Sequence, residues 1–134
     1  MGFFDLVNIR AINGKLNDLM PVVEANLSRF TTYFDNNFKV TKRQKYGQNS
    51  LYSLGEYEEV ILTTQKNIDE LLRLKKEFES EFESAHKIVE KIKPVTFLDD
   101  DSSYVHWNNK LASINFSYNF VIKLMNNHKI YIQS

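Results

Sequence analysis

The chain has 134 residues, of which 43% are apolar and 25% are charged. We expect one domain, residues 1–134, with a hydrophobic core of its own rather than a disordered segment. Lys plus Arg and Asp plus Glu both number 17, so the formal net charge is zero, which argues against a protein that coats nucleic acid. The absence of cysteine excludes disulfides, thiolate metal sites and a cysteine nucleophile.

The N-terminal residues do not resemble a secretory signal. Asp5, Asn8 and Arg10 interrupt the short apolar run that contains Phe3 and Phe4. All uncharged apolar runs are far shorter than the ~20 residues of a membrane span, so we expect a cytoplasmic protein with no membrane span. The preference for Lys over Arg and the many Asn residues are typical of an AT-rich genome, which favours a bacterial or phage origin.

The first predicted element is a long helix with an apolar seam over residues 6–34 and with its C-terminal end at the basic residues 39–45. Its apolar side chains recur at alternating steps of three and four, which keeps them on one helix face. These positions, with one Asn among them, are Leu6, Ile9, Asn13, Leu16, Met20, Val23, Leu27, Phe30 and Phe34. Pro21 removes a backbone donor, so we predict a kink there, and a full break would give a four-helix variant. As an alternative, Asn13 and Gly14 form a hairpin turn that follows a strand over residues 3–12.

The second predicted element is a helix of about 38 residues, or ~57 Å, that ends near Pro94. The same spacing continues through Leu54, Tyr57, Ile61, Thr64, Ile68, Leu71, Lys75, Phe78, Phe82, Ala85, Val89 and Ile92. Ser53 and Glu56 have capping-box spacing, which places the start of this helix near Ser53. Strand-like alternation occurs nowhere over a comparable length.

The third predicted element is a helix that follows three consecutive aspartates, residues 99–101. Its regular positions are Trp107, Leu111, Ile114, Tyr118, Val121, Met125, His128 and Ile132. A second apolar row on another face contains Ala112, Phe116, Phe120 and Leu124. A helix with two apolar faces is either buried between its neighbours, which we favour, or makes an oligomer contact. The last residues, 129–134, either extend this helix or fray.

These elements predict an all-α fold. Three long helices joined by two short connections favour an elongated antiparallel three-helix bundle with coiled-coil-like heptad seams.

We find no arrangement of side chains that indicates catalysis or metal binding. Glu83 and His86 have the Glu-x-x-His spacing of helical di-iron sites, but no second copy occurs in the chain. The aspartates at 99–101 lack the remaining ligands of a calcium loop, and His106 and His128 are too far apart on one helix to act together. We therefore expect no enzyme, no metal and no cofactor.

The remaining candidates are binding surfaces. A basic stretch with one aromatic residue coincides with the C-terminus of the first predicted helix, where it can compensate the helix dipole or contact phosphates and bases. Aromatic residues outside the regular positions can anchor a protein partner. The candidate interaction surface is Phe3, Phe4, Lys39, Lys42, Arg43, Lys45, Tyr46, Phe116 and Phe120.

The sequence thus favours a non-catalytic protein–protein interaction module. In size and composition the chain is similar to small helical immunity proteins and phage-encoded inhibitors, and an adaptor or a secretion chaperone fits the same pattern. We expect another protein as partner, with a homo-oligomer through the third helix as a variant of this hypothesis. The alternative is a weak nucleic-acid-binding accessory protein that uses the Lys39–Lys45 patch.

Overall fold

The computed structural model describes residues 3–44, 57–92 and 102–133, with side chains of 3–9, 44 and 102 excluded. The elements follow in the order α1 (Phe3–Asn37), β1 (Lys39–Gln44), β2 (Tyr57–Thr64), α2 (Gln65–Glu90), α3 (Ser102–Asn127) and β3 (Lys129–Gln133).

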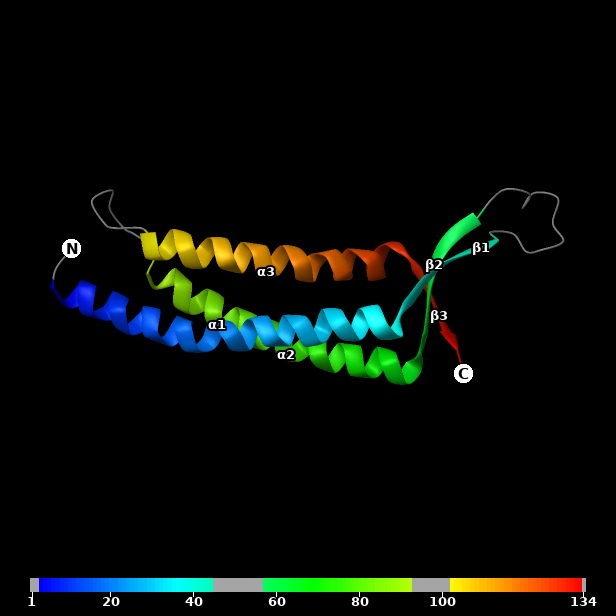
Figure 1. Ribbon diagram of the computed structural model, residues 1–134, viewed down its shortest axis with the longest axis horizontal. Coiled ribbons are helices and arrows are strands. Elements are labelled where there is room, and N and C mark those ends of the chain that lie inside the picture. The colour runs from blue at the N-terminus through cyan, green and yellow to red at the C-terminus, as the bar shows by residue number, and fades with distance from the viewer. Residues whose placement is uncertain (1–2, 45–56, 93–101, 134) are drawn as a thin grey trace.

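The three helices lie side by side along the long axis of an elongated molecule, and the strands form a small sheet at one end (Figure 1). The chain runs in the same direction in α1 and α3 and in the opposite direction in α2 (Figure 1). The prediction of a mainly helical protein with three long helices is confirmed. The prediction of an all-α fold without strands is wrong, because three strands are present.

Helix α1 is continuous through Pro21. Neither a four-helix variant nor a strand before Asn13 and Gly14 is therefore present. Proline has no backbone N–H, so the carbonyl group of Asn17, one turn earlier, lacks its usual helical hydrogen bond. Because Pro21 is exposed, this carbonyl lies on the solvent side of the helix. The predicted spacing describes the packed face well, since Leu16, Met20, Val23, Phe30 and Phe34 are all buried.

The predicted start of the second helix is wrong by about three turns. Residues Tyr57–Thr64 form strand β2, and α2 begins at Gln65. Thr64 is the N-cap, because its backbone is extended and its side-chain oxygen accepts a hydrogen bond from the Asn67 backbone N–H at 3.1 Å. The consecutive residues Val60 and Ile61 are both fully buried, as expected for a β-branched strand covered on two faces.

Strand β2 lies at the centre of the sheet, between β1 and β3. It pairs antiparallel with β1, where Val40 is opposite Ile61, and parallel with β3, where Ile130 is opposite Ile61. Helix α1 ends at Asn37, so Lys39, Lys42 and Arg43 lie on a strand rather than at a helix C-terminus. The last residues likewise form β3 instead of extending or fraying from the third helix.

Aromatic rings from all three helices meet in the core. The Tyr118 ring of α3 lies 5.2 Å from Phe30 of α1 and 4.5 Å from Phe78 of α2, measured between ring centroids. Toward the other end, the Trp107 indole N–H donates to the Asn13 side-chain oxygen at 2.8 Å. This hydrogen bond gives the polar edge of a buried indole a partner on α1.

A group of hydrogen bonds connects the helices to the sheet. The Asn67 side chain accepts from the Tyr33 hydroxyl at 2.9 Å and donates to the Asn37 carbonyl at 3.3 Å. The same carbonyl accepts from the buried Thr63 hydroxyl at 2.9 Å. The junction therefore joins the end of α1, the end of β2 and the first turn of α2.

Candidate protein-interaction surface

Two phenylalanines on α3 are the most exposed large apolar side chains in the described part of the chain. Phe116 is 76% exposed and Phe120 is 60% exposed. We had favoured burial of their row between neighbouring helices, and that expectation is wrong for these two residues. They face solvent because α1 and α2 both pack against the opposite side of α3.

Helix geometry explains this orientation. Ile114 and Tyr118 are buried, and Phe116 lies two residues from each, or about 200° round the helix. Val121 is also buried against the core, one residue after the exposed Phe120. Helix α3 thus has a buried apolar stripe and an exposed one, whereas α2 has a single apolar stripe opposite charged residues.

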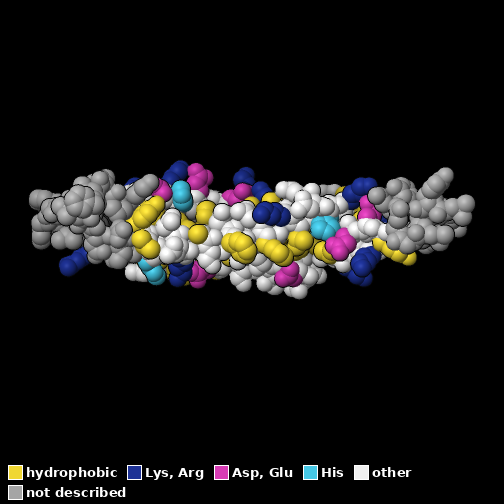
Figure 2. All heavy atoms as spheres, turned by 90° about the horizontal axis from the view of Figure 1, so that it is seen from above, with side chains coloured by type: hydrophobic (Ala, Val, Ile, Leu, Met, Phe, Trp, Pro, Cys, Tyr) yellow, Lys and Arg dark blue, Asp and Glu magenta, His cyan; other side chains and the backbone are white. Residues whose placement is uncertain are grey.

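The exposed stripe lies in a segment without charge. Residues 111–122 contain no Asp, Glu, Lys, Arg or His, and Ser102–Asn127 contains no acidic residue at all. Seen from the α3 side, hydrophobic side chains form a row along the middle of the molecule, with charged side chains on either side (Figure 2). Among the exposed residues of α3, we define the outer α3 face as the six that continue the line of Phe116 and Phe120 along the helix at steps of three and four, which are Asn109, Ser113, Phe116, Phe120, Lys123 and Asn127.

This combination of features is typical of a protein-binding surface. The cores of protein interfaces are rich in aromatic side chains and poor in charged ones, and their rims are polar. The sequence analysis found Phe116 and Phe120 but missed the four polar residues of this face. The signal that would have indicated them is the spacing, because alternating steps of three and four continue from the two phenylalanines in both directions.

Two of the three described basic residues of β1 are paired in register with acidic residues of β2. Lys42 is opposite Glu59 and Arg43 is opposite Glu58 in the β1–β2 pairing. Because directly opposite residues in antiparallel strands have Cβ atoms about 5 Å apart, these acids reduce the positive potential of Lys42 and Arg43. Lys39 is opposite Leu62 and has no such neighbour in that register.

Arg43 also contacts an aromatic ring. Its guanidinium carbon lies 4.3 Å from the centroid of the Tyr131 ring on β3. Because Arg43 pairs with Glu58 and Tyr131 pairs with Leu62, their side chains meet over β2 at Val60, which is fully buried. This cation–π contact gives Arg43 a structural role on one face of the sheet.

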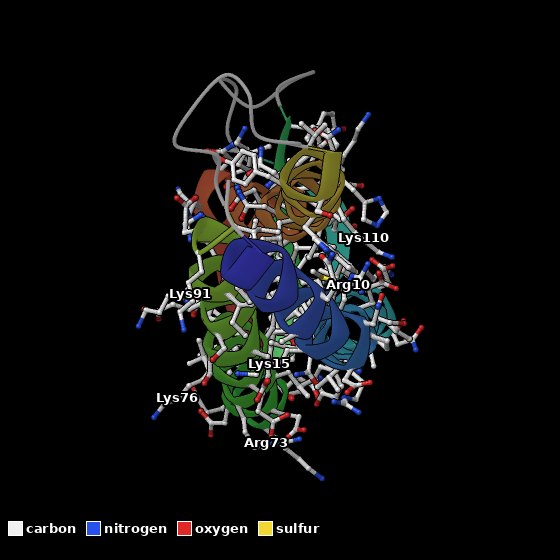
Figure 3. The ribbon with its side chains drawn as sticks, turned by 90° about the vertical axis from the view of Figure 1, so that its left-hand side faces the viewer. Arg10, Lys15, Arg73, Lys76, Lys91 and Lys110 are labelled. Atoms are coloured by element: carbon white, nitrogen blue, oxygen red, sulfur yellow. The ribbon has the colours of Figure 1, made fainter. Side chains whose placement is uncertain are left out.

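The labelled cations of the helices do not gather on one face. Seen along the long axis, Lys76 of α2 and Lys91, the C-cap residue of that helix, point to one side, and Lys110 of α3 points to the other, with Lys15 between them (Figure 3). Lys110 forms an ion pair with Glu24 of α1 at 3.1 Å. The six labelled cations therefore do not form one basic surface (Figure 3).

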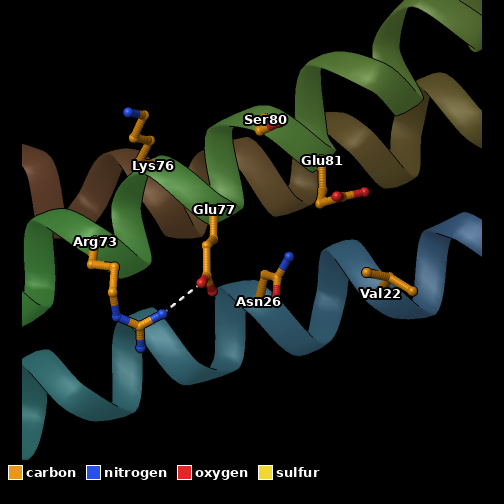
Figure 4. Close-up of a pocket in the computed structure, with 7 residues that line it drawn as sticks. All are labelled: Val22, Asn26, Arg73, Lys76, Glu77, Ser80 and Glu81. Atoms are coloured by element: carbon orange, nitrogen blue, oxygen red, sulfur yellow. Dashed lines mark hydrogen bonds and ion pairs between the residues drawn. The ribbon is translucent and has the colours of Figure 1, made fainter.

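A groove lies between α1 and α2, with a volume of about 540 Å³ (Figure 4). Val22 and Asn26 line it from α1, and α2 contributes mainly charged residues, Arg73 among them. Arg73 forms ion pairs with Glu70 and, at 2.5 Å, with Glu77, and its hydrogen bond holds the pKa of Glu70 below the usual value. Within the groove, Arg73 and Glu77 are therefore engaged with each other.

The two residues of the Glu-x-x-His motif of α2 contact separate partners. Glu83 lies 3.2 Å from Lys87, and His86 lies 3.7 Å from Glu90. Within residues 3–44, 57–92 and 102–133, no three His, Asp or Glu side chains come together as a set of metal ligands. In the same ranges, no helix has the length and apolar character that crossing a bilayer needs.

His128 connects the end of α3 to the sheet. Its Nε2 lies 3.2 Å from a Glu59 carboxylate oxygen, and its Nδ1 lies 2.7 Å from the Leu124 carbonyl oxygen. Both ring nitrogens thus face acceptors, and only the imidazolium form can donate to both. The hydrogen bond with Glu59, supported by that with Leu124, raises the pKa of His128 above its usual value.

Some predicted site residues lie outside the described part of the chain. Phe3 and Phe4 belong to the first turn of α1, but their side chains are not described, and Lys45 and Tyr46 fall outside the described ranges altogether. The structure therefore brings Phe116 and Phe120 together on α3 and places Lys39, Lys42 and Arg43 on β1 at one end of the molecule.

Comparisons of this chain with protein-family models, with curated proteins and with solved structures give no match.

Proposed function

We propose that the protein is a non-catalytic protein-binding module that binds its partner through the outer α3 face. The observation that carries this proposal is the exposure of Phe116 and Phe120, 76% and 60%, within a charge-free segment of a helix packed on its other side. Aromatic side chains that become fully desolvated supply much of the binding energy in protein interfaces.

The exposed area of the two rings sets the scale of this interaction. At about 200 Å² for a whole side chain, they offer ~270 Å² of accessible surface. Burying this area against an apolar partner would release about 7 kcal/mol before the cost of association is subtracted. Because that cost is of the same order, the polar residues around the two rings must also contact the partner.

The elongated arrangement of three helices suits such a role. We propose that the helices act as an antiparallel bundle with coiled-coil-like seams that holds the binding helix rigid, so little order has to be gained on binding. A cytoplasmic immunity protein, inhibitor or adaptor from a bacterium or a phage fits this design. Nucleic-acid binding by the Lys39–Lys45 patch has less support, because Glu58 and Glu59 oppose Arg43 and Lys42.

The proposal can be tested by affinity capture from lysate of the source organism. The bait is the wild-type protein, the Phe116→Ala/Phe120→Ala variant, or Leu72→Ala as a control, since Leu72 is 50% exposed on α2. We expect a protein retained at high salt by the wild type and by Leu72→Ala but lost from the double variant. Equal capture by all three baits, or capture of nucleic acid that high salt removes, would contradict the proposal.

A further inference from the structure

The outer α3 face follows a heptad pattern of its own. Its six residues, numbers 109, 113, 116, 120, 123 and 127, are separated by alternating steps of four and three. This is the spacing of the contact positions in a coiled coil, where a straight stripe of one helix faces a like stripe of another. The pattern is continuous over five steps, and all six residues are exposed.

Two such stripes match when the helices are antiparallel. With the contact centred on residue 118, Phe116 faces Phe120 of the second helix, and Phe120 faces Phe116. The next layers on each side pair Ser113 with Lys123, and the outermost layers pair Asn109 with Asn127. The result is an aromatic centre with a polar rim, which is the usual composition of a protein interface.

The charges select this orientation. In a parallel pair each Lys123 would face its own copy, which places like charges opposite each other, and no acidic residue of α3 could compensate them. In the antiparallel pair Lys123 faces Ser113, and the stripe contains no further charge. The formal net charge of the chain is zero, so two copies approach without overall repulsion.

We infer that the outer α3 face binds a second copy of this chain, with the two α3 helices antiparallel and centred on residue 118. This inference rests on the proposed function and names the partner. The four phenylalanine side chains of such a dimer would bury about 540 Å². That is about one third of a standard protein interface, so the flanking residues must supply the remainder, and we expect a reversible dimer.

Sedimentation equilibrium from about 10 µM to 1 mM protein tests whether the partner is a second copy of the chain. We expect the average mass to rise with concentration from the 15.8 kDa of one chain toward twice that value. Phe116→Glu/Phe120→Glu should weaken the dimer by at least ~100-fold, because it buries four carboxylates. Leu72→Glu changes an exposed apolar residue on α2 and should behave as the wild type, and circular dichroism checks that each variant is folded.

Single cysteines test the orientation, because the chain has none of its own. Ser113→Cys and Lys123→Cys, each oxidised alone or mixed in equal amounts, should give a disulfide-linked dimer mainly in the mixture. Disulfides that form mainly within each separate variant would indicate a parallel pair and would overturn the antiparallel arrangement.

A wild type that stays monomeric over the whole range would overturn the inference that the partner is a second copy. The proposed function would survive this result if the lysate experiment still recovered another protein through Phe116 and Phe120. The proposed function would fail as well if Phe116→Ala/Phe120→Ala captured the same proteins from the lysate as the wild type. The two failures are therefore distinguishable.

Discussion

Asn67 offers a sharp test of how the helices are joined to the sheet. Its side chain accepts from the Tyr33 hydroxyl at 2.9 Å and donates to the Asn37 carbonyl at 3.3 Å. Asn67→Ala removes both hydrogen bonds but keeps the backbone N–H that Thr64 caps. We expect this variant to be less stable than the wild type, although alanine is the better helix former.

The size of the effect follows from three contributions. Two neutral hydrogen bonds stabilise the protein by about 1 kcal/mol each. The higher helix propensity of alanine offsets about 0.6 kcal/mol of this loss of stability. The Asn37 carbonyl keeps its bond from Thr63, and half-buried Tyr33 can bind water, so neither group is left without a partner. We expect a net loss of about 1.5 kcal/mol, or a fall in Tm of ~5 °C.

A double-mutant cycle isolates the Tyr33–Asn67 bond. Urea unfolding followed by circular dichroism gives the free energies of unfolding of the wild type, Tyr33→Phe, Asn67→Ala and the double variant. We expect a coupling energy of about 1 kcal/mol. Gln65→Ala is the matched control, because it removes an exposed hydrogen bond to Asp69 from the same helical turn and should change stability by less than ~0.5 kcal/mol.

Two results would refute this reasoning. A coupling energy within error of zero would show that Tyr33 and Asn67 do not interact in solution. An Asn67→Ala variant as stable as the wild type would show that helix propensity outweighs the junction, as expected if residue 67 lay inside a longer exposed helix that starts near residue 53.

Three further predictions concern the helix cap, the core and the pH dependence. Thr64→Ala should cost about 1 kcal/mol in urea unfolding, and Thr64→Ser should restore most of it, since serine keeps the capping oxygen; equal losses would exclude the cap. Phe78→Ala should lower the free energy of unfolding by about 4 kcal/mol, because Phe78 is 1% exposed and lies between aromatic neighbours. A fall in Tm of only a few degrees in thermal unfolding would contradict this central position of Phe78 in the core. The raised pKa of His128 stabilises the folded state below pH ~6.5, and this contribution is lost as the pH rises through the folded-state pKa. We therefore expect the free energy of unfolding to fall by more in the wild type than in His128→Gln as the pH rises above about 6.5, and parallel pH profiles would contradict the role of the Glu59 contact.

Local spacing in the sequence determined much of the helical part. In α1 the steps of three and four identified the buried face, including Leu16 and Phe30, because a helix that packs along its length repeats its environment every 3.6 residues. In α3 the same spacing correctly placed Trp107 and Val121 in the core. The charge balance and the absence of cysteine also follow directly from the sequence, since they depend on composition alone.

The same spacing failed at the sheet for a physical reason. Tyr57, Ile61 and Thr64 fit the helical steps, yet they belong to a strand. Strand β2 satisfies its backbone groups by pairing with β1 and with β3, whose residues lie about 70 positions further along the chain. A pattern within one segment carries no information about such a distant partner.

The candidate site shows the same division. The sequence by itself determined that α3 has a second apolar row and a charge-free centre, because these follow from residue types and their order. Only the tertiary structure decided which row is covered. Helices α1 and α2 both pack on the side of Ile114 and Tyr118, so Phe116 and Phe120 remain in contact with water. Burial depends on where the neighbouring helices lie, and that position is fixed by the packing of the whole chain.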